Sequence, residues 1–348
     1  MRQRVLLGLA IAAALSAVGA GAWRWRANNL EPSPDPAAVG SSRAVVHDIT
    51  RRSERRGGLD VTFFAASDTH LGFDSSEHDL LGKLHDPLTR PRGVELVNQR
   101  QIRDMNAMPG RPWPAELGGN IERPRGVLIS GDLTENGDPW QWRHFVAHYG
   151  LNGGDGLLAF PVFEGHGNHD KHHSWYVLDR IRERHGATRY AFDWDDLHLV
   201  CLGEAPDDDA LAWLAQDLAS VGRERPVIVY FHFPLQGPYS EDNWFGRGNY
   251  RDTFATAVTG YNVIAVFHGH FHASGRYRWR ALDVYNMGAA KHRRFAFGVV
   301  RVTDDRLRVA SWHHGDQHWE WWHEKPINGS AVTPRAGGER ADQGAMFD

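Results

Sequence analysis

The sequence predicts an α/β fold, and two observations carry this prediction. Short apolar runs of the length expected for buried strands alternate with segments of helical periodicity along most of the 348 residues. An Asp, Asn or His side chain follows directly after five of these runs. Alternating strands and helices favour sheets covered by helices, and polar residues at strand ends are typical of ligand sites in such sheets.

The individual elements follow from the length and periodicity of the apolar runs. Buried strands are expected at "VTFFAAS" (61–67), "GVLIS" (126–130), "FPVFEG" (160–165), "LHLVCLG" (197–203), "VIVYF" (227–231) and "VIAVF" (263–267). Helices are expected over residues 94–108, 140–149, 174–185 and 209–221. Later apolar runs at 282–286, 296–303 and 307–312 predict closing strands. Four tryptophans are expected to pack between sheets: Trp312, Trp319, Trp321 and Trp322.

Composition and charge exclude several classes of protein. The apolar and charged fractions are 41% and 24%, as in ordinary globular proteins. The net charge of −4 offers no basic footprint, so no nucleic-acid partner is expected and a nuclease is disfavoured. Cys201 is the one cysteine of the sequence, which excludes an intramolecular disulfide and a thiolate metal cluster. We expect Cys201 to be a small buried residue of a strand.

The N-terminal residues have the pattern of an export signal. Arg2 and Arg4 precede an apolar run over residues 5–18, and the small residues 20–22 follow. The apolar run is short for a membrane span, which favours cleavage over an uncleaved N-terminal anchor. We therefore expect an exported protein, periplasmic or secreted, with membrane attachment through this segment as the alternative.

The composition divides the chain into four segments. Residues 1–22 form the export signal or anchor, and the Pro- and Ser-rich stretch within 23–58 predicts a linker. Residues 59–330 are expected to form the folded domain. Residues 331–348 are rich in Gly, Arg and small side chains and predict a flexible tail. No pattern in the sequence indicates whether the protein is a monomer or an oligomer.

The five polar strand ends point to one site. They are Asp68-Thr69-His70, Gly131-Asp132, Gly167-Asn168-His169-Asp170, His232 and His268-Gly269-His270-Phe271-His272. Any one of these motifs is a weak signal, because Gly-Asp after a strand is usually a turn and a single His is usually a satisfied polar group. Because ligands bind at the carboxyl ends of strands in α/β sheets, we expect all five to line one crevice.

The order D-x-H, GD, GNHD, H and GHxH resembles the calcineurin-like metallophosphoesterase superfamily, over residues 61–272. The resemblance implies a two-sheet α/β sandwich flanked by helices. It also implies a site for two divalent metal ions, Mn, Zn or Fe. Asp68, His70 and His272 would hold one ion, Asn168, His232 and His270 would hold the other, and Asp132 would bridge them.

The donor chemistry is consistent with that implication. Oxygen and imidazole ligands without sulfur suit Zn, Mn or Fe. The positive charge of two divalent ions exceeds the negative charge of Asp68, Asp132 and a hydroxide. The site would therefore be net positive and would attract a phosphate. The resemblance implies that a hydroxide bridging the ions attacks phosphorus in an in-line displacement, and that His169 assists the leaving group.

The other polar residues of these motifs are sorted by their positions in the sequence. In "VFEGHGNHDKHHSW" we expect His166 to pack within its loop, with a place in the cleft as the alternative, and His172 and His173 to lie on the surface. Asp170 either orients His169 or begins the following helix. His268 is expected to be a packed or supporting histidine rather than a metal ligand.

The substrate is predicted by exclusion. "GDLTENG" lacks the tyrosine of purple acid phosphatases, and the motifs of protein Ser/Thr phosphatases are missing. We therefore expect a small phosphorylated substrate; the sequence leaves monoester and diester open and favours a phosphodiester or nucleotide-like compound. The alternatives are a non-catalytic scaffold with the same fold, and a membrane-anchored phosphomonoesterase or lipid-phosphate hydrolase. Specificity is expected in the loops 73–125, 234–250 and 286–294, where Lys291, Arg293 and Arg294 either meet a second anion or are simply solvated.

Overall fold

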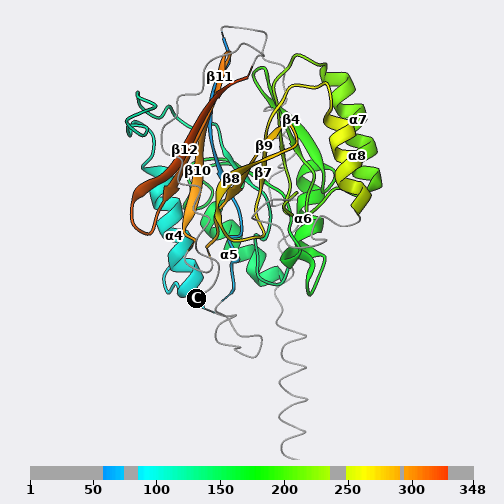
Figure 1. Ribbon diagram of the computed structural model, residues 1–348. Helices are drawn as coiled ribbons and strands as arrows, with labels where there is room; N and C mark the ends of the chain where they lie inside the picture. The colour runs from blue at the N-terminus through cyan, green and yellow to red at the C-terminus, as the bar shows by residue number, and fades with distance from the viewer. Residues whose placement is uncertain (1–57, 74–84, 236–247, 291–293, 328–348) are drawn as a thin grey trace, which may run out of the picture. The chain divides into compact units, whose positions relative to one another are not determined.

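The computed structural model describes residues 58–73, 85–235, 248–290 and 294–327. These residues form two six-stranded mixed sheets that pack face to face, with helices on both outer faces (Figure 1). The predicted α/β sandwich is therefore confirmed. The export segment, the linker and the tail lie outside the described residues, as do Arg247, Lys291 and Arg293 of the predicted specificity loops.

The first sheet has the strand order β12-β11-β10-β1-β2-β3. Its strands are β1 (Asp60–Ala66), β2 (Val127–Ile129), β3 (Val162–Glu164), β10 (Ala296–Thr303), β11 (Arg306–His313) and β12 (His318–Pro326). The strands β1, β2 and β3 are parallel, so their carboxyl ends lie at the same edge of the sheet.

The second sheet has the strand order β4-β5-β6-β7-β9-β8. Its strands are β4 (Tyr190–Trp194), β5 (Leu197–Cys201), β6 (Val227–Tyr230), β7 (Val263–His268), β8 (Ser274–Trp279) and β9 (Leu282–Met287). The inner strands β5, β6, β7 and β9 are parallel, and β4 and β8 pair antiparallel at the two edges.

The two-residue period of the strands builds the core. In β1, Val61, Phe63 and Ala65 belong to the apolar core between the sheets, whereas Phe64 and Ala66 face the helices on the outer side. The strands of the second sheet alternate in the same way between the inter-sheet core and an outer core. Each sheet is therefore apolar on both faces, which explains the nearly continuous apolar runs in the sequence.

Helices cover both outer faces. The outer core of the first sheet includes residues of α4 (Gly93–Asn106), α5 (Pro139–Tyr149) and α6 (Tyr176–His185), and that of the second sheet residues of α7 (Asp208–Val221) and α8 (Gly248–Val258). The side chain of Asp207 caps α7 by accepting a hydrogen bond from the Ala210 amide. The four predicted helices are confirmed to within two residues, and α8, β4, β8 and β12 were not predicted. Within the described residues, no helix is long and apolar enough to cross a bilayer.

The prediction for the four tryptophans is wrong for three of them. Trp321 lies in the core between the sheets, but Trp312, Trp319 and Trp322 pack on the outer face of the first sheet. Adjacent residues of a strand face opposite sides, so Trp321 and Trp322 cannot share a layer. Trp312 is further fixed because its Nε1 donates to Asp104 of α4 at 2.9 Å.

Candidate metal centre

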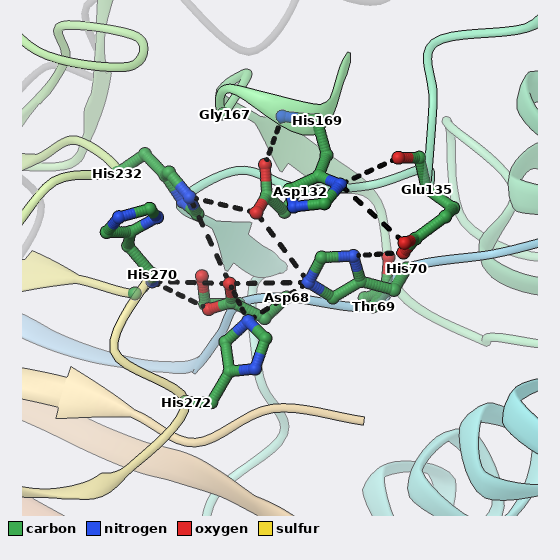
Figure 2. Close-up of polar contacts among 12 residues, drawn as sticks. Asp68, Thr69, His70, Asp132, Glu135, Gly167, His169, His232, His270 and His272 are labelled. Carbon is green, nitrogen blue, oxygen red and sulfur yellow. Dashed lines mark hydrogen bonds and ion pairs between the residues drawn. The ribbon is translucent and has the colours of Figure 1, made fainter. Parts of the chain in front are cut away.

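The five predicted strand ends meet at one place (Figure 2). Three of them follow β1, β2 and β3 of the first sheet, and the other two follow β6 and β7 of the second sheet. The site therefore lies where the carboxyl ends of the parallel strands of both sheets come together.

The first group of donor atoms gathers around Asp68. Asp68, His70, Asp132 and His272 each offer one atom, and these atoms lie within 4.8 Å of one another. His272 Nε2 is 3.2 Å from Asp68 Oδ1 and 3.1 Å from His70 Nε2. His70 Nε2 is 3.7 Å from Asp68 Oδ1 and 3.6 Å from Asp132 Oδ2.

The second group shares Asp132 with the first. It consists of Asp132, His232 and His270, with His232 Nε2 at 3.1 Å from Asp132 Oδ2. Asn168 lies beside this group, because the amide of the next residue, His169, donates to Asp132 Oδ1 at 2.9 Å. The structure thus divides the side chains between two groups joined at Asp132. This is the arrangement that the ligand prediction requires, and the ligand roles themselves stay a prediction.

The backbone at this site is held in an unusual conformation. Five of the candidate ligands have φ between 46° and 66°, a left-handed region that non-glycine residues rarely adopt: Asp68, His70, Asp132, His270 and His272. Among the described residues, only three other non-glycine residues have positive φ. Such residues cost roughly 1–3 kcal/mol each and concentrate at functional sites.

The motif glycines allow the loops to approach closely. A Cβ at Gly167 would lie 2.2 Å from Asp132 Oδ1, and a Cβ at Gly269 would lie 2.3 Å from Asp68 Oδ2. Neither contact is possible for a larger residue without moving a carboxylate. The glycines of GNHD and GHxH therefore bring the loops of different strands into one site.

The two carboxylates are fully buried and ionised. Burial raises the pKa of Asp68 and of Asp132, but the facing His272 and His232 outweigh it, and both pKa values lie below the ordinary range. Burial lowers the pKa of His232, yet Asp132 outweighs it and raises that pKa to about 9. Burial lowers the pKa of His270 to about 3, so this ring is neutral at physiological pH.

The residues present fit divalent metal ions. Asn168 Oδ1 and His232 Nδ1 are buried with no hydrogen-bond partner, which is uncommon for buried polar atoms. Two buried carboxylates, an amide oxygen and four imidazoles make a donor set without sulfur, of the kind that binds Zn, Mn or Fe. Divalent cations would satisfy the buried charge and the unpartnered atoms together.

His169 lies at the rim of the site, where its side chain is 29% exposed. Its Nδ1 donates to the carbonyl oxygen of Glu135 at 2.7 Å, and its ring centroid is 4.8 Å from that of His70. Burial lowers the pKa of His169 below the ordinary value. Because Nδ1 is engaged, Nε2 is the nitrogen available for exchange of a proton with a substrate.

Glu135 is a site residue that the sequence analysis missed. Its Oε2 is 2.8 Å from His70 Nδ1, and its Oε1 is 3.8 Å from His169 Nδ1 (Figure 2). The carboxylate therefore supports the far side of the His70 ring, and the backbone carbonyl supports His169. Glu135 stands three residues after Asp132 in "GDLTENG", but nothing in the sequence indicated that its side chain points towards His70.

Asp170 has neither of the two roles predicted for it. Its carboxylate accepts hydrogen bonds from the amides of Leu133, Thr134 and Gly167 and from the Thr134 hydroxyl, at 2.8–3.1 Å. It therefore ties the GD loop to the GNHD loop instead of orienting His169 or starting α6. Burial raises the pKa of Asp170 to about 6.

The remaining histidines lie where the sequence placed them. His166 is buried within the loops, where a Cβ at Gly203 would lie 2.4 Å from its ring, and burial lowers its pKa to about 3. His172 and His173 are exposed. His268 is buried, packs against Tyr277 at 5.7 Å between ring centroids, and belongs to neither donor group.

Comparison with known proteins gives a match at the level of family and of sequence. A family model described as calcineurin-like phosphoesterase matches residues 61–274. The glycerophosphodiester phosphodiesterase GpdQ of Enterobacter lignolyticus (strain SCF1) is 25% identical over 192 residues. The match covers 51% of this chain and 66% of that relative, just under two thirds of its length.

Solved structures share the fold at low sequence identity. A dimetal phosphatase from Danio rerio has a TM-score of 0.53 at 14% identity, covering 78% of this chain and 99% of that one. Purple acid phosphatase PPD1 from yellow lupin (Lupinus luteus) seeds has a TM-score of 0.54 at 13% identity, covering 81% of this chain and 58% of that one. GAP50, the anchor in the inner membrane complex of Plasmodium, has a TM-score of 0.53 at 12% identity, covering 78% and 90%. At these identities the likeness concerns the fold alone.

Proposed function

Since the chain belongs to the calcineurin-like phosphoesterase family, we propose that this metal-dependent phosphoesterase hydrolyses small phosphodiesters. The observation that carries the proposal is the pair of donor groups that share the buried carboxylate of Asp132. The preference for a diester is supported by the similarity to a glycerophosphodiester phosphodiesterase.

Each candidate ligand has an assigned place in this proposal. Asp68, His70 and His272 would hold one divalent ion, Asn168, His232 and His270 would hold the other, and Asp132 would be shared between them. Bound ions of the Mn, Zn or Fe type would supply Lewis acidity and an activated water. The amide of His270 donates to both oxygens of Asp68, at 3.2 and 3.0 Å, and so fixes the orientation of that carboxylate.

His169 is the proposed catalytic acid. The Glu135 carbonyl accepts a hydrogen bond from Nδ1, so in the protonated ring the second N–H, at Nε2, is directed to donate its proton to the departing oxygen and leaves His169 neutral. An alkoxide leaving group is a strong base, and a positioned acid therefore accelerates its departure. The ring is partly exposed at the rim, where a substrate can reach it.

The proposal is tested with full-length protein that has been stripped of metal and then titrated with Mn²⁺, Zn²⁺ or Fe²⁺. Hydrolysis of bis(p-nitrophenyl) phosphate and of p-nitrophenyl phosphate is measured in parallel, and His169→Ala is the matched variant. We expect metal to restore turnover, with a higher kcat/KM for the diester. A higher kcat/KM for the monoester would overturn the diester preference, and two bound ions without turnover of either ester would favour a scaffold.

We also propose that the enzyme is exported, on the strength of the N-terminal sequence pattern alone. Intact-mass measurement of the protein from a periplasmic or secreted fraction would locate the N-terminus. A mature chain that begins near residue 23 is expected. A full-length chain in the membrane fraction would instead indicate an N-terminal anchor.

A further inference from the structure

A second cluster of metal-binding side chains lies outside the strand-end site. It consists of His85 in the segment before α4, Glu95 in the first turn of α4, and His144 on α5. The donor atoms of the three side chains lie within 4.8 Å of one another. None of these residues belongs to the donor groups around Asp68 and Asp132.

The cluster is removed from water. The side chains of His85, Glu95 and His144 are 4%, 3% and 8% exposed. Three ionisable groups in one buried place cost stability unless each is compensated. Burial raises the pKa of Glu95, but the neighbouring His144 and His85 outweigh it, and the net change is downward. The carboxylate is therefore ionised and in the form that binds a cation.

Hydrogen bonding does not account for the whole arrangement. His85 Nε2 lies 2.7 Å from Glu95 Oε2, as a hydrogen-bonded pair would. His144 Nδ1 and Glu95 Oε1 lie 2.8 Å apart, within ion-pair distance, yet neither atom makes a geometrically aligned hydrogen bond. The two atoms are close enough for a hydrogen bond but are not aligned for one. Two atoms that bind the same ion show this geometry, because both point at the ion and not at each other.

The surrounding residues hold the three side chains in place. The Arg92 amide donates to Glu95 Oε2 at 3.0 Å and fixes the carboxylate. The His144 ring packs edge-on between Trp140 and His85, with centroids 5.1 and 5.2 Å away. Contacts of this kind around the ligands are typical of metal sites in proteins.

We propose that His85, Glu95 and His144 bind a divalent transition-metal ion at a site separate from the strand-end site. Two imidazoles and one glutamate are a donor set that zinc uses in proteins. The ion would tie the segment at His85 to α4 and α5. The same helices support the strand-end site, because Asn98 of α4 donates to the Thr69 carbonyl at 2.8 Å and accepts from Tyr149 of α5 at 2.6 Å.

The test is a count of bound zinc in the full-length protein. Metal-free protein is loaded with Zn²⁺, passed through a desalting column, and analysed by inductively coupled plasma mass spectrometry. The variants are His144→Asn and His85→Asn. His148→Asn is the matched control, because His148 is a buried histidine one turn further along α5 that lies outside the cluster. Circular dichroism and the zinc-dependent rise in Tm are recorded for each protein.

We expect each cluster variant to bind one zinc ion fewer per chain than the wild type and the His148 variant. We also expect zinc to raise the Tm of the cluster variants less. Equal zinc content in all four proteins would overturn the proposal and identify the cluster as a polar contact only. If one cluster variant does not fold, the other gives the count. The difference is independent of phosphodiester turnover, so failure here and failure of the proposed function are distinguishable.

Discussion

The strand-end site and the core between the two sheets are both buried, but they are built in opposite ways. The core is apolar, and in it the ring centroid of Phe63 lies 5.5 Å from that of Trp194 and 6.3 Å from that of Phe267. The site contains the buried carboxylates of Asp68 and Asp132, left-handed backbone and unpartnered polar atoms. The core therefore contributes stability, whereas the site gives up stability in order to bind ions and a substrate.

The largest expected effect is that of a substitution at His169, which should lower activity while leaving stability nearly unchanged. His169→Ala should lower kcat on a dialkyl phosphodiester by roughly 10²–10⁴-fold, because the leaving group is then a strongly basic alkoxide and proton transfer by a positioned side chain contributes that much. The free energy of unfolding should change by less than about 1 kcal/mol, since the side chain is partly exposed. Steady-state kinetics and urea unfolding measure the two quantities. His172→Ala, which removes an exposed histidine of the same loop, is the control. Unchanged kcat in His169→Ala would remove this residue from the mechanism.

A substitution in the core should have the second largest effect, and it should change stability while leaving kcat nearly unchanged. Phe63 is fully buried between the sheets, and Phe63→Ala should lower the free energy of unfolding by about 3–5 kcal/mol. The kcat of the folded fraction should stay within about twofold, because Phe63 contacts no substrate. Leu157→Ala removes an apolar side chain that is 42% exposed and should have little effect on either quantity. A large loss of kcat in folded Phe63→Ala would show that core packing and site geometry are coupled.

Glu164, at the end of β3, is a buried charged residue that is neither part of the apolar core nor a candidate metal ligand. Burial raises the pKa of Glu164, but Arg184 and His185 outweigh it and lower the pKa to about 2, from an ordinary value of 4.5. Because the pKa of Glu164 is lower in the folded than in the unfolded protein, its ionised carboxylate stabilises the fold above pH 4.5. This contribution is lost as the pH falls from 4.5 towards 2 and the carboxylate becomes protonated. Its size at neutral pH is on the order of 3 kcal/mol.

Urea unfolding of the wild type and of Glu164→Gln between pH 7 and pH 3 measures this contribution. The wild type should be the more stable protein at pH 7, and the difference should shrink as the pH falls. A difference that does not depend on pH would mean that the contacts of Glu164 contribute through shape and not through charge.

The sequence predicted that the polar strand ends would meet in one site because strand ends are readable from a single chain. A buried strand appears as an apolar run, and the residue after the run is placed at the sheet edge by geometry alone. This placed Asp68, Asp132, His232 and His270 at one site, as the structure shows, whereas their assignment as metal ligands rests on the family resemblance and stays a prediction. Strand β8, with the sequence "SGRYRW", and helix α8 were missed because their apolar patterns are weak.

Side-chain direction is what the sequence could not supply. Nothing in "GDLTENG" shows that Glu135 turns back towards His70, or that Asp170 accepts the amides of the GD loop. The cluster of His85, Glu95 and His144 has no motif spacing either, because its members come from a loop and two helices. The faces of the tryptophans in β12 depend on strand register, which is fixed only by the partner strand.

The smallest expected effect concerns Glu135, which acts through other residues. Its carboxylate supports His70 at 2.8 Å, and loss of such a partner typically costs about 10–100-fold in metal affinity or activity. Glu135→Gln keeps the size and one acceptor oxygen but removes the charge, so a higher metal concentration should be needed for half-maximal activity. Glu204→Gln is the matched control, because the Glu204 side chain is equally exposed at 17% and pairs with Lys171 instead of a site histidine. If Glu135→Gln lowers stability but leaves the metal dependence of turnover unchanged, Glu135 only packs against the site and does not tune it.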